Sequence, residues 1–214
     1  MSKSMLDKGL KEVEEIISEM SDLAERTVKA SIEAFLEGGS VEVQVRAWSD
    51  ALRSMYNDLE EKAVDLLARY NPVAKDLRFL KASMKIAYDL SRFGRYAFDI
   101  SHTVHLLDGY VKSGEEVSFL REMGNKTLEM LKLSTEIYKT KNLELIDKLY
   151  SLEGEVDNLY ISHLKEMARN PPKKTEILIV STLLTRHLER IGDHACYIAE
   201  ETHYMVTGRQ MYLR

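Results

Sequence analysis

The chain has 214 residues, of which 44% are hydrophobic and 30% are charged, and its formal net charge is −5 at pH 7. This length allows one large domain or two small ones, and the acidic balance argues against a general nucleic-acid-binding protein. Its 3 prolines and 10 glycines are few for such a chain, as expected of a helical globular protein rather than a disordered one.

The cysteine content and the N-terminal segment favour a cytoplasmic protein. The single cysteine, Cys196, cannot form an intramolecular disulfide, which is typical of a reducing compartment. The N-terminal segment lacks the apolar core of a secretion signal, and the longest apolar stretch, around residues 177–184, is too short to cross a bilayer. We therefore expect a cytoplasmic chain, with a peripheral position at the cytoplasmic membrane as the alternative.

Hydrophobic residues recur every three or four positions along almost the whole chain, which predicts helices. These apolar stripes span residues 6–34, 41–66, 77–104, 117–137, 145–163 and 177–205. Gly38-Gly39, Asn71-Pro72 and Asn170-Pro171 separate neighbouring stripes, since glycine pairs and X-Pro sequences end helices. One stripe per helix is what a bundle requires. We predict an all-α fold of six helices.

The two halves of the chain resemble each other in sequence. The segment from Leu90 to Arg95 (LSRFGR) aligns with the segment from Leu188 to Asp193 (LERIGD), and ARYNP at residues 68–72 aligns with ARNP at residues 168–171. Such an internal repeat indicates duplication. We therefore expect two tandem three-helix bundles with pseudo-twofold symmetry, at residues 1–112 and 113–214.

Two pairs of acidic residues stand out in the second half. Glu153 and Asp157 lie four positions apart, as do Glu189 and Asp193, so each pair lies on one face of a helix, one turn apart. Like charges at this spacing repel. Because the pairs lie at the rims of apolar stripes on consecutive helices, which are usually antiparallel neighbours, their four carboxylates could surround a cation. Oxygen ligands favour iron, manganese, magnesium or calcium.

Other interpretations of these residues stay open. His163, His187 and His194 are candidate additional ligands, although His163 lies on an apolar stripe and is more typical of a hydrogen-bonded core residue. The acidic residues could also be solvated, in which case the chain would be a metal-free interaction module.

An enzyme is the competing class of function. Carboxylate-bridged di-iron oxidases of the ferritin-like type carry two Glu-x-x-His motifs on their helices. Residues 200–203 (EETH) give one such match, and residues 99–102 (DISH) give a weaker second one at a position that the duplication does not relate to the first. The sequence shows no nucleophile–base arrangement and no phosphate-cradling glycine loop, which favours a protein that is not an enzyme.

Two motifs and the repeat together resemble the PhoU family of phosphate-uptake regulators. The motifs are ERIGD at residues 189–193 and PVAKDLR at residues 72–78, and the resemblance spans nearly the whole chain. It implies two three-helix bundles, each with a multinuclear metal site, with iron as the expected metal, formed by E(D)xxxD motifs on the last two helices of the bundle. It also implies a negative regulator of phosphate uptake and signalling that contacts a phosphate-specific ABC transporter at the inner membrane face and, where one exists, a sensor histidine kinase. Apolar and aromatic residues outside the stripes, notably among the 11 tyrosines, could serve a homodimer contact.

The family pattern carries over to only one half of this chain. The second half has all four acidic positions, namely Glu153, Asp157, Glu189 and Asp193. The equivalent positions of the first half are Ser49, Arg53, Ser91 and Arg95. Since arginine keeps its positive charge, we expect metal in the second half and none in the first. Arg53 and Arg95 would instead be solvated, paired with Asp50, Asp89 or Asp99, or bound to an anion.

Overall fold

The computed structural model describes residues 2–106 and 115–213, which form six α-helices and a short 3₁₀ helix. The helices are α1 (Ser2–Glu37), α2 (Glu42–Tyr70), α3 (Ala74–Leu106), α4 (Glu115–Thr140), η1 (Leu143–Leu145), α5 (Ile146–Arg169) and α6 (Thr175–Thr207). No strand occurs within these two ranges, so the predicted all-α fold is confirmed. The expected boundary between the repeats, at residues 112 and 113, lies outside the described residues.

Left-handed residues end two of the helices, and one of these ends is at the predicted Asn71-Pro72 break. Asn71 follows α2 in the left-handed conformation with a φ of 45°, and its N–H donates to the carbonyl of Leu67 at 3.1 Å. Gly208 follows α6 in the same way, with a φ of 75° and a hydrogen bond to the carbonyl of Tyr204 at 2.8 Å. Left-handed residues of this kind satisfy the last carbonyl groups of a helix, and glycine adopts that conformation without strain.

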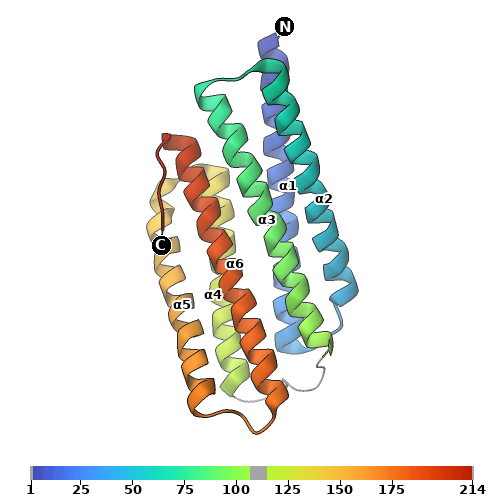
Figure 1. Ribbon diagram of the computed structural model, residues 1–214, viewed down its shortest axis with the longest axis vertical. Coiled ribbons are helices and arrows are strands. Elements are labelled where there is room, and N and C mark those ends of the chain that lie inside the picture. The colour runs from blue at the N-terminus through green and yellow to red at the C-terminus, as the bar shows by residue number, and fades with distance from the viewer. Residues whose placement is uncertain (1, 107–114, 214) are drawn as a thin grey trace.

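Two layers of three helices lie side by side (Figure 1). Helices α1, α2 and α3 pack together, and so do α4, α5 and α6. The third helix of each half, α3 and α6, pack against each other in the centre, and α1 also contacts α4. Since α3 and α6 carry the duplicated LSRFGR and LERIGD segments, equivalent helices of the two halves meet at the centre of the molecule.

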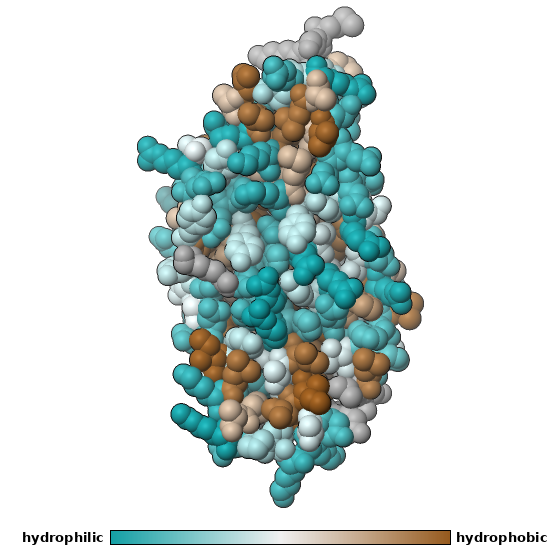
Figure 2. All heavy atoms as spheres, viewed as in Figure 1, coloured by the Kyte–Doolittle hydropathy of each residue, from teal (hydrophilic) through white to brown (hydrophobic). Residues whose placement is uncertain are grey.

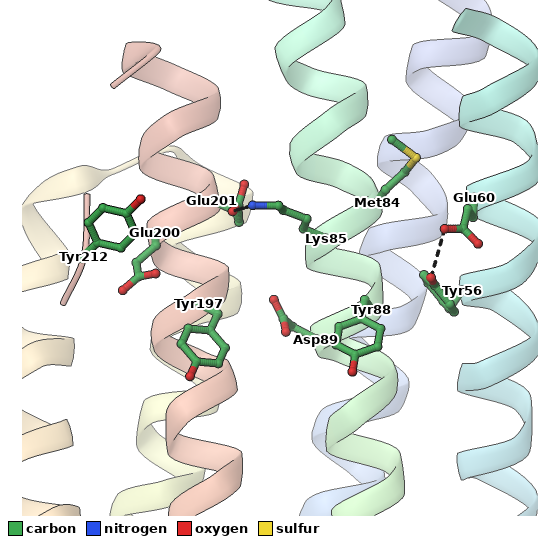
Figure 3. A pocket seen from close by; sticks show the side chains of 10 residues that line it. All are labelled: Tyr56, Glu60, Met84, Lys85, Tyr88, Asp89, Tyr197, Glu200, Glu201 and Tyr212. Carbon is green, nitrogen blue, oxygen red and sulfur yellow. Dashed lines mark hydrogen bonds and ion pairs between the residues drawn. The ribbon is translucent and has the colours of Figure 1, made fainter. Parts of the chain in front are cut away.

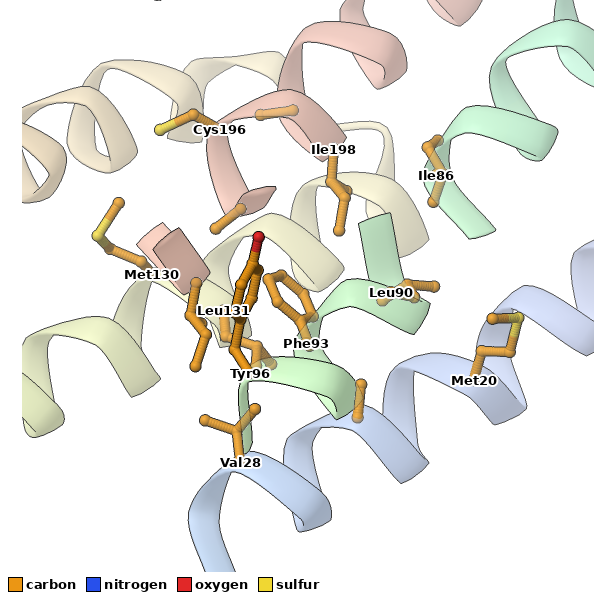
Figure 4. Packing of buried hydrophobic residues seen from close by; sticks show 14 of the residues in the cluster. Met20, Val28, Ile86, Leu90, Phe93, Tyr96, Met130, Leu131, Cys196 and Ile198 are labelled. Atoms are coloured by element: carbon orange, nitrogen blue, oxygen red, sulfur yellow. The ribbon is translucent and has the colours of Figure 1, made fainter. Parts of the chain in front are cut away.

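The two halves share one hydrophobic core. Figure 4 shows Met20 of α1, Leu90 and Phe93 of α3, Leu131 of α4 and Ile198 of α6 within the same cluster. Each of these side chains is almost completely buried. One cluster of buried side chains thus spans both halves, and burial of apolar side chains is the main favourable term in folding. The interface between the halves is therefore part of the core rather than a contact between separate domains.

Hydrophobic atoms on one face of the molecule gather near its two ends, and the middle is mainly hydrophilic (Figure 2). Ile179 and Leu183, four positions apart near the start of α6, are 47% and 41% exposed. No helix in the described part of the chain is both long enough and apolar enough to cross a membrane.

Gly94 on α3 allows a close approach to α2. A Cβ atom at this position would lie 2.7 Å from Leu52 Cδ1 and 3.2 Å from the backbone Cα of Ser49. Leu52 is fully buried, so α2 and α3 would have to separate to make room. We expect Gly94→Ala to lower the free energy of unfolding by about 1–3 kcal/mol, measured by chemical denaturation.

Gly154 on α5 offers a matched control for this substitution. A Cβ atom there would meet no other atom within 4 Å. Because alanine has the higher helix propensity, Gly154→Ala should raise the free energy of unfolding by about 0.5–1 kcal/mol. A rise of similar size at Gly94 would contradict the close packing of α2 against α3.

Candidate metal centre

Three of the four predicted metal ligands gather between α5 and α6. One carboxylate oxygen each from Asp157, Glu189 and Asp193 lies within 4.8 Å of the others. Asp193 is 1% exposed and Glu189 is 8% exposed, whereas Asp157 is half-buried. We call these three residues the carboxylate group. Charged side chains are rarely buried unless an opposite charge compensates them, so this arrangement calls for positive charge nearby.

Glu153, the fourth predicted ligand, lies one helical turn before Asp157 on α5. Its side chain is buried, with 8% exposed. It is not among the oxygen atoms that meet within 4.8 Å in the described part of the chain. The structure therefore brings together one acidic residue of the α5 pair and both acidic residues of the α6 pair.

Gly192 lets α6 pack closely against α4, next to the α6 acidic residues. A Cβ atom on Gly192 would lie 3.2 Å from Met130 Cε of α4 and 3.8 Å from Val156 Cγ1 of α5. The absence of a side chain thus lets α6 approach α4, whereas on the α5 side a methyl group would make an ordinary van der Waals contact with Val156. Val156 directly precedes Asp157, so Gly192 packs beside the carboxylate group.

Two arginines of α6 pair with the carboxylate group. Arg186 Nη1 donates to Glu189 Oε2 at 2.6 Å, and Arg190 Nη1 donates to Asp193 Oδ2 at 2.7 Å. The side chains of Arg186 and Arg190 are 46% and 30% exposed. Charge-assisted hydrogen bonds of this length are strong, so the guanidinium groups neutralise part of the negative charge. A bound cation would share the carboxylates of Glu189 and Asp193 with these guanidinium groups.

The first half has no equivalent of the carboxylate group among its described residues. Arg53 pairs with Asp50 at 3.5 Å, and Arg95 pairs with Asp99 at 3.1 Å. The arginine side chains are 75% and 58% exposed. These contacts agree with the interpretation that Arg53 and Arg95 are solvated and paired with neighbouring acidic residues.

The duplication of the chain agrees with a comparison to known protein families. A family model described as "PhoU domain" matches residues 17–104 and again residues 120–202. The chain belongs to the PhoU family. The two matches cover both halves, as the predicted repeat requires.

Two relatives named as PhoU homologues match over most of their own length. A "Phosphate-specific transport system accessory protein PhoU homolog" of Clostridium acetobutylicum is 30% identical over 99% of this chain and 98% of its own length. A protein of the same name from Rhizobium meliloti is 30% identical over 97% of this chain and 89% of its own. The crystal structure of PhoU from Pseudomonas aeruginosa superposes with a TM-score of 0.87, at 26% identity, over 95% of this chain and 99% of the other.

The histidines proposed as extra ligands of this PhoU family member contact other groups. The His163 ring stacks on Phe119 with 4.9 Å between ring centroids, and burial lowers the pKa of His163. His194 Nδ1 lies 2.7 Å from Asp89 Oδ1 of α3. His187 lies beside the ring of Tyr96, with 6.1 Å between centroids. None of them joins the carboxylate group, so the additional histidine ligands are not part of the site as it stands.

The two motifs of the di-iron alternative do not form a site among the described residues. Glu200 accepts a hydrogen bond from the backbone N–H of Leu213 at 2.7 Å, and His203 Nδ1 lies 3.0 Å from the carbonyl of Arg209. In the first half, His102 Nδ1 lies 2.7 Å from Glu42 Oε1. Glu200, His203 and His102 thus interact with other groups of the protein rather than with one another. Nothing in this geometry favours a ferritin-like oxidase over the PhoU family.

Proposed function

We propose that this PhoU family member is a negative regulator of phosphate uptake and phosphate signalling that acts through protein contacts rather than catalysis. The observation that carries the proposal is the match of both repeats over nearly the full length of relatives named as accessory proteins of phosphate-specific transport systems. Its partner would be a phosphate-specific ABC transporter at the inner membrane face, with a sensor histidine kinase as a second partner.

A metal ion fits the residues that the structure brings together. Asp157, Glu189 and Asp193 offer only carboxylate oxygens, which suit iron, manganese, magnesium or calcium, and iron is our first expectation. A bound cation would supply positive charge that joins α5 to α6. Arg186 and Arg190 hydrogen-bond to Glu189 and Asp193 and would hold these two carboxylates in place beside the ion. The role of the site would be structural.

The proposed assembly is a homodimer without nucleic acid. The exposed apolar residues Ile179 and Leu183, near the start of α6, are suited to a protein contact, because exposed apolar surface commonly marks such sites. The acidic net charge of −5 supports the absence of a nucleic-acid partner.

Complementation in a bacterium that lacks its own PhoU protein tests the regulatory role. In phosphate-replete medium such cells should express a phosphate-starvation reporter at a high level. They should also take up phosphate at a high rate. Expression of this chain should restore the low reporter signal and the low rate of labelled phosphate uptake. An unchanged reporter and uptake rate, with the protein shown to be present by immunoblotting, would contradict the proposal.

A further inference from the structure

A cavity of about 460 Å³ lies between the two halves, away from the carboxylate group (Figure 3). It is bounded by α2 and α3 of the first half and by α6 and the C-terminal segment of the second. Its volume is within the range of small-molecule sites in proteins. Its residues on α6, Tyr197 to Glu201, lie one to two turns beyond Asp193 and share no member with the carboxylate group.

The lining of this cavity carries more negative than positive charge. Four carboxyl side chains line it, from Glu60, Asp89, Glu200 and Glu201, and one ammonium group, from Lys85, which pairs with Glu201. Four negative charges and one positive charge leave a formal charge of −3. Counting the neighbouring His194, which bonds to Asp89, as positive still leaves −2.

The carboxylates also affect one another. Burial raises the pKa of Glu200, and the hydrogen bond from the N–H of Leu213 opposes this shift. The charges of Glu201 and Asp89 raise the pKa further, so the net direction is upward. Burial is the largest of these causes and the neighbouring carboxylates add to it, so a nearby positive charge would favour the ionised form of Glu200. A positively charged ligand would supply that charge.

Aromatic rings form the rest of the wall. Tyr56, Tyr88, Tyr197 and Tyr212 all line the cavity. Tyr56 and Tyr88 meet edge to face, with ring centroids 5.9 Å apart and an angle of 72° between the rings. Figure 3 shows Tyr88 on α3 and Tyr197 on α6 on opposite sides of the gap, with Asp89 between them. Tyrosine faces attract cations, and they pack well against aliphatic chains.

We propose that this cavity binds an organic cation, namely a primary ammonium or guanidinium group on a short aliphatic chain. The carboxylates attract its charge, while the tyrosine rings and Met84 contact its methylene groups. A bare metal ion fits less well, because no three of these carboxylates meet within ligand distance as those of the carboxylate group do. The same chemistry could come from a free amine or guanidine metabolite, or from a lysine or arginine side chain of a partner protein.

Such a ligand would contact both halves of the molecule and the C-terminal segment. Glu200 connects α6 to that segment through the hydrogen bond from Leu213, whose side chain is buried. Tyr212, next to it, is 75% exposed and lines the cavity. A bound cation would therefore lie beside Tyr212 as well as beside residues of both halves. This inference is independent of the metal site and of the regulatory role.

Calorimetric titration with two probes tests the proposal. Agmatine carries an ammonium and a guanidinium group on a free four-carbon chain, and N-acetyl-arginine amide presents the arginine side chain as a protein would. We expect at least one to bind with one-to-one stoichiometry and a Kd below about 1 mM, and the uncharged 1,4-butanediol not to bind. Tighter binding of agmatine indicates a free metabolite, and tighter binding of the arginine amide indicates a partner side chain.

Variants locate the binding. The Glu200→Gln/Tyr88→Leu protein removes one charge and one aromatic face and should weaken binding by about tenfold. Its matched control is Glu166→Gln/Tyr150→Leu, which makes the same changes at exposed positions of α5 and should bind as the wild type does. If the first variant does not fold, as judged by circular dichroism, Glu60→Gln at an exposed position replaces it, with an expected loss of about two- to fivefold.

Three results would overturn the proposal. The first is no saturable binding of either probe up to roughly 10 mM. The second is equal binding by the wild type and the cavity variant. The third is loss of binding in Glu189→Gln/Asp193→Asn, because that result would place the cation at the carboxylate group instead. Retained binding in this last variant supports the cavity, whether or not the protein binds metal.

Discussion

The double variant Glu189→Gln/Asp193→Asn is expected to lose nearly all of the metal that the purified wild-type protein binds. The substitutions remove two of the three carboxylates of the carboxylate group and leave Asp157 alone. They also release Arg186 and Arg190 from their ion pairs, so two positive charges remain beside the site. Both changes disfavour a cation. The measurement is elemental analysis after loading with excess metal and gel filtration.

A charge-matched control separates this effect from a general loss of negative charge. Glu155→Gln/Glu166→Gln removes two exposed carboxylates from α5, the helix that carries Asp157. Its metal content should equal that of the wild type. An unchanged metal content in Glu189→Gln/Asp193→Asn would reject the site between α5 and α6.

A second large effect is expected at the buried pair of Asp89 on α3 and His194 on α6. Their side chains are 7% and 5% exposed, and His194 Nδ1 lies 2.7 Å from Asp89 Oδ1. Removing one partner of such a pair leaves the other buried without compensation. We expect His194→Ala to lower the free energy of unfolding by about 3 kcal/mol near neutral pH, measured by chemical denaturation.

The cost of this substitution should depend on pH. Burial raises the pKa of Asp89 above its ordinary value of 3.8, and His194 is the main group that opposes the shift. Without His194, the folded protein holds the proton of Asp89 more tightly than the unfolded chain does. The destabilisation should therefore be smallest below pH 3.8 and grow as the pH rises through the folded-state pKa.

A double-mutant cycle identifies the charge as the cause. In an Asp89→Asn background the buried group is neutral at every pH, so His194→Ala should cost less than half as much and show little dependence on pH. Equal losses in the two backgrounds, or the same loss at acidic and neutral pH, would show that the effect comes from packing alone.

Most of the fold could be predicted from the sequence because its signals are local. Asn71-Pro72 and Gly38-Gly39 mark helix ends, and the structure ends α2 at Tyr70 and α1 at Glu37. The apolar stripes recur within single helices, so their period alone identifies them. The repeat of LSRFGR as LERIGD indicated two equivalent halves, and the structure packs those helices, α3 and α6, against each other.

The composition of the carboxylate group depends on how far α5 is shifted and rotated against α6, which no local pattern sets. The spacing of Glu153 and Asp157 places both residues on one face of α5, yet only the carboxylate of Asp157 lies close to those of Glu189 and Asp193. The ion pairs of the two α6 arginines could have been predicted from the sequence, because Arg186 precedes Glu189 by three positions and Arg190 precedes Asp193 by three. Residues at that spacing are neighbours on a helix.

The cavity between the halves had no sequence signal. Its residues come from four separate segments, around positions 56–60, 84–89, 197–201 and 212. Only the packing of α2, α3, α6 and the C-terminal segment brings them together. For the same reason the sequence offered Asp89 as a partner for the arginines of the first half, whereas the structure pairs it with His194, which is 105 positions away.

Anomalous diffraction from crystals of the iron- or manganese-loaded protein tests the central claim most directly, namely that one half holds a cation and the other does not. We predict an anomalous peak among the carboxylates of Asp157, Glu189 and Asp193, and none beside Arg53 and Arg95. A peak in the first half, or no peak between α5 and α6 in crystals shown to contain the metal, would contradict this account.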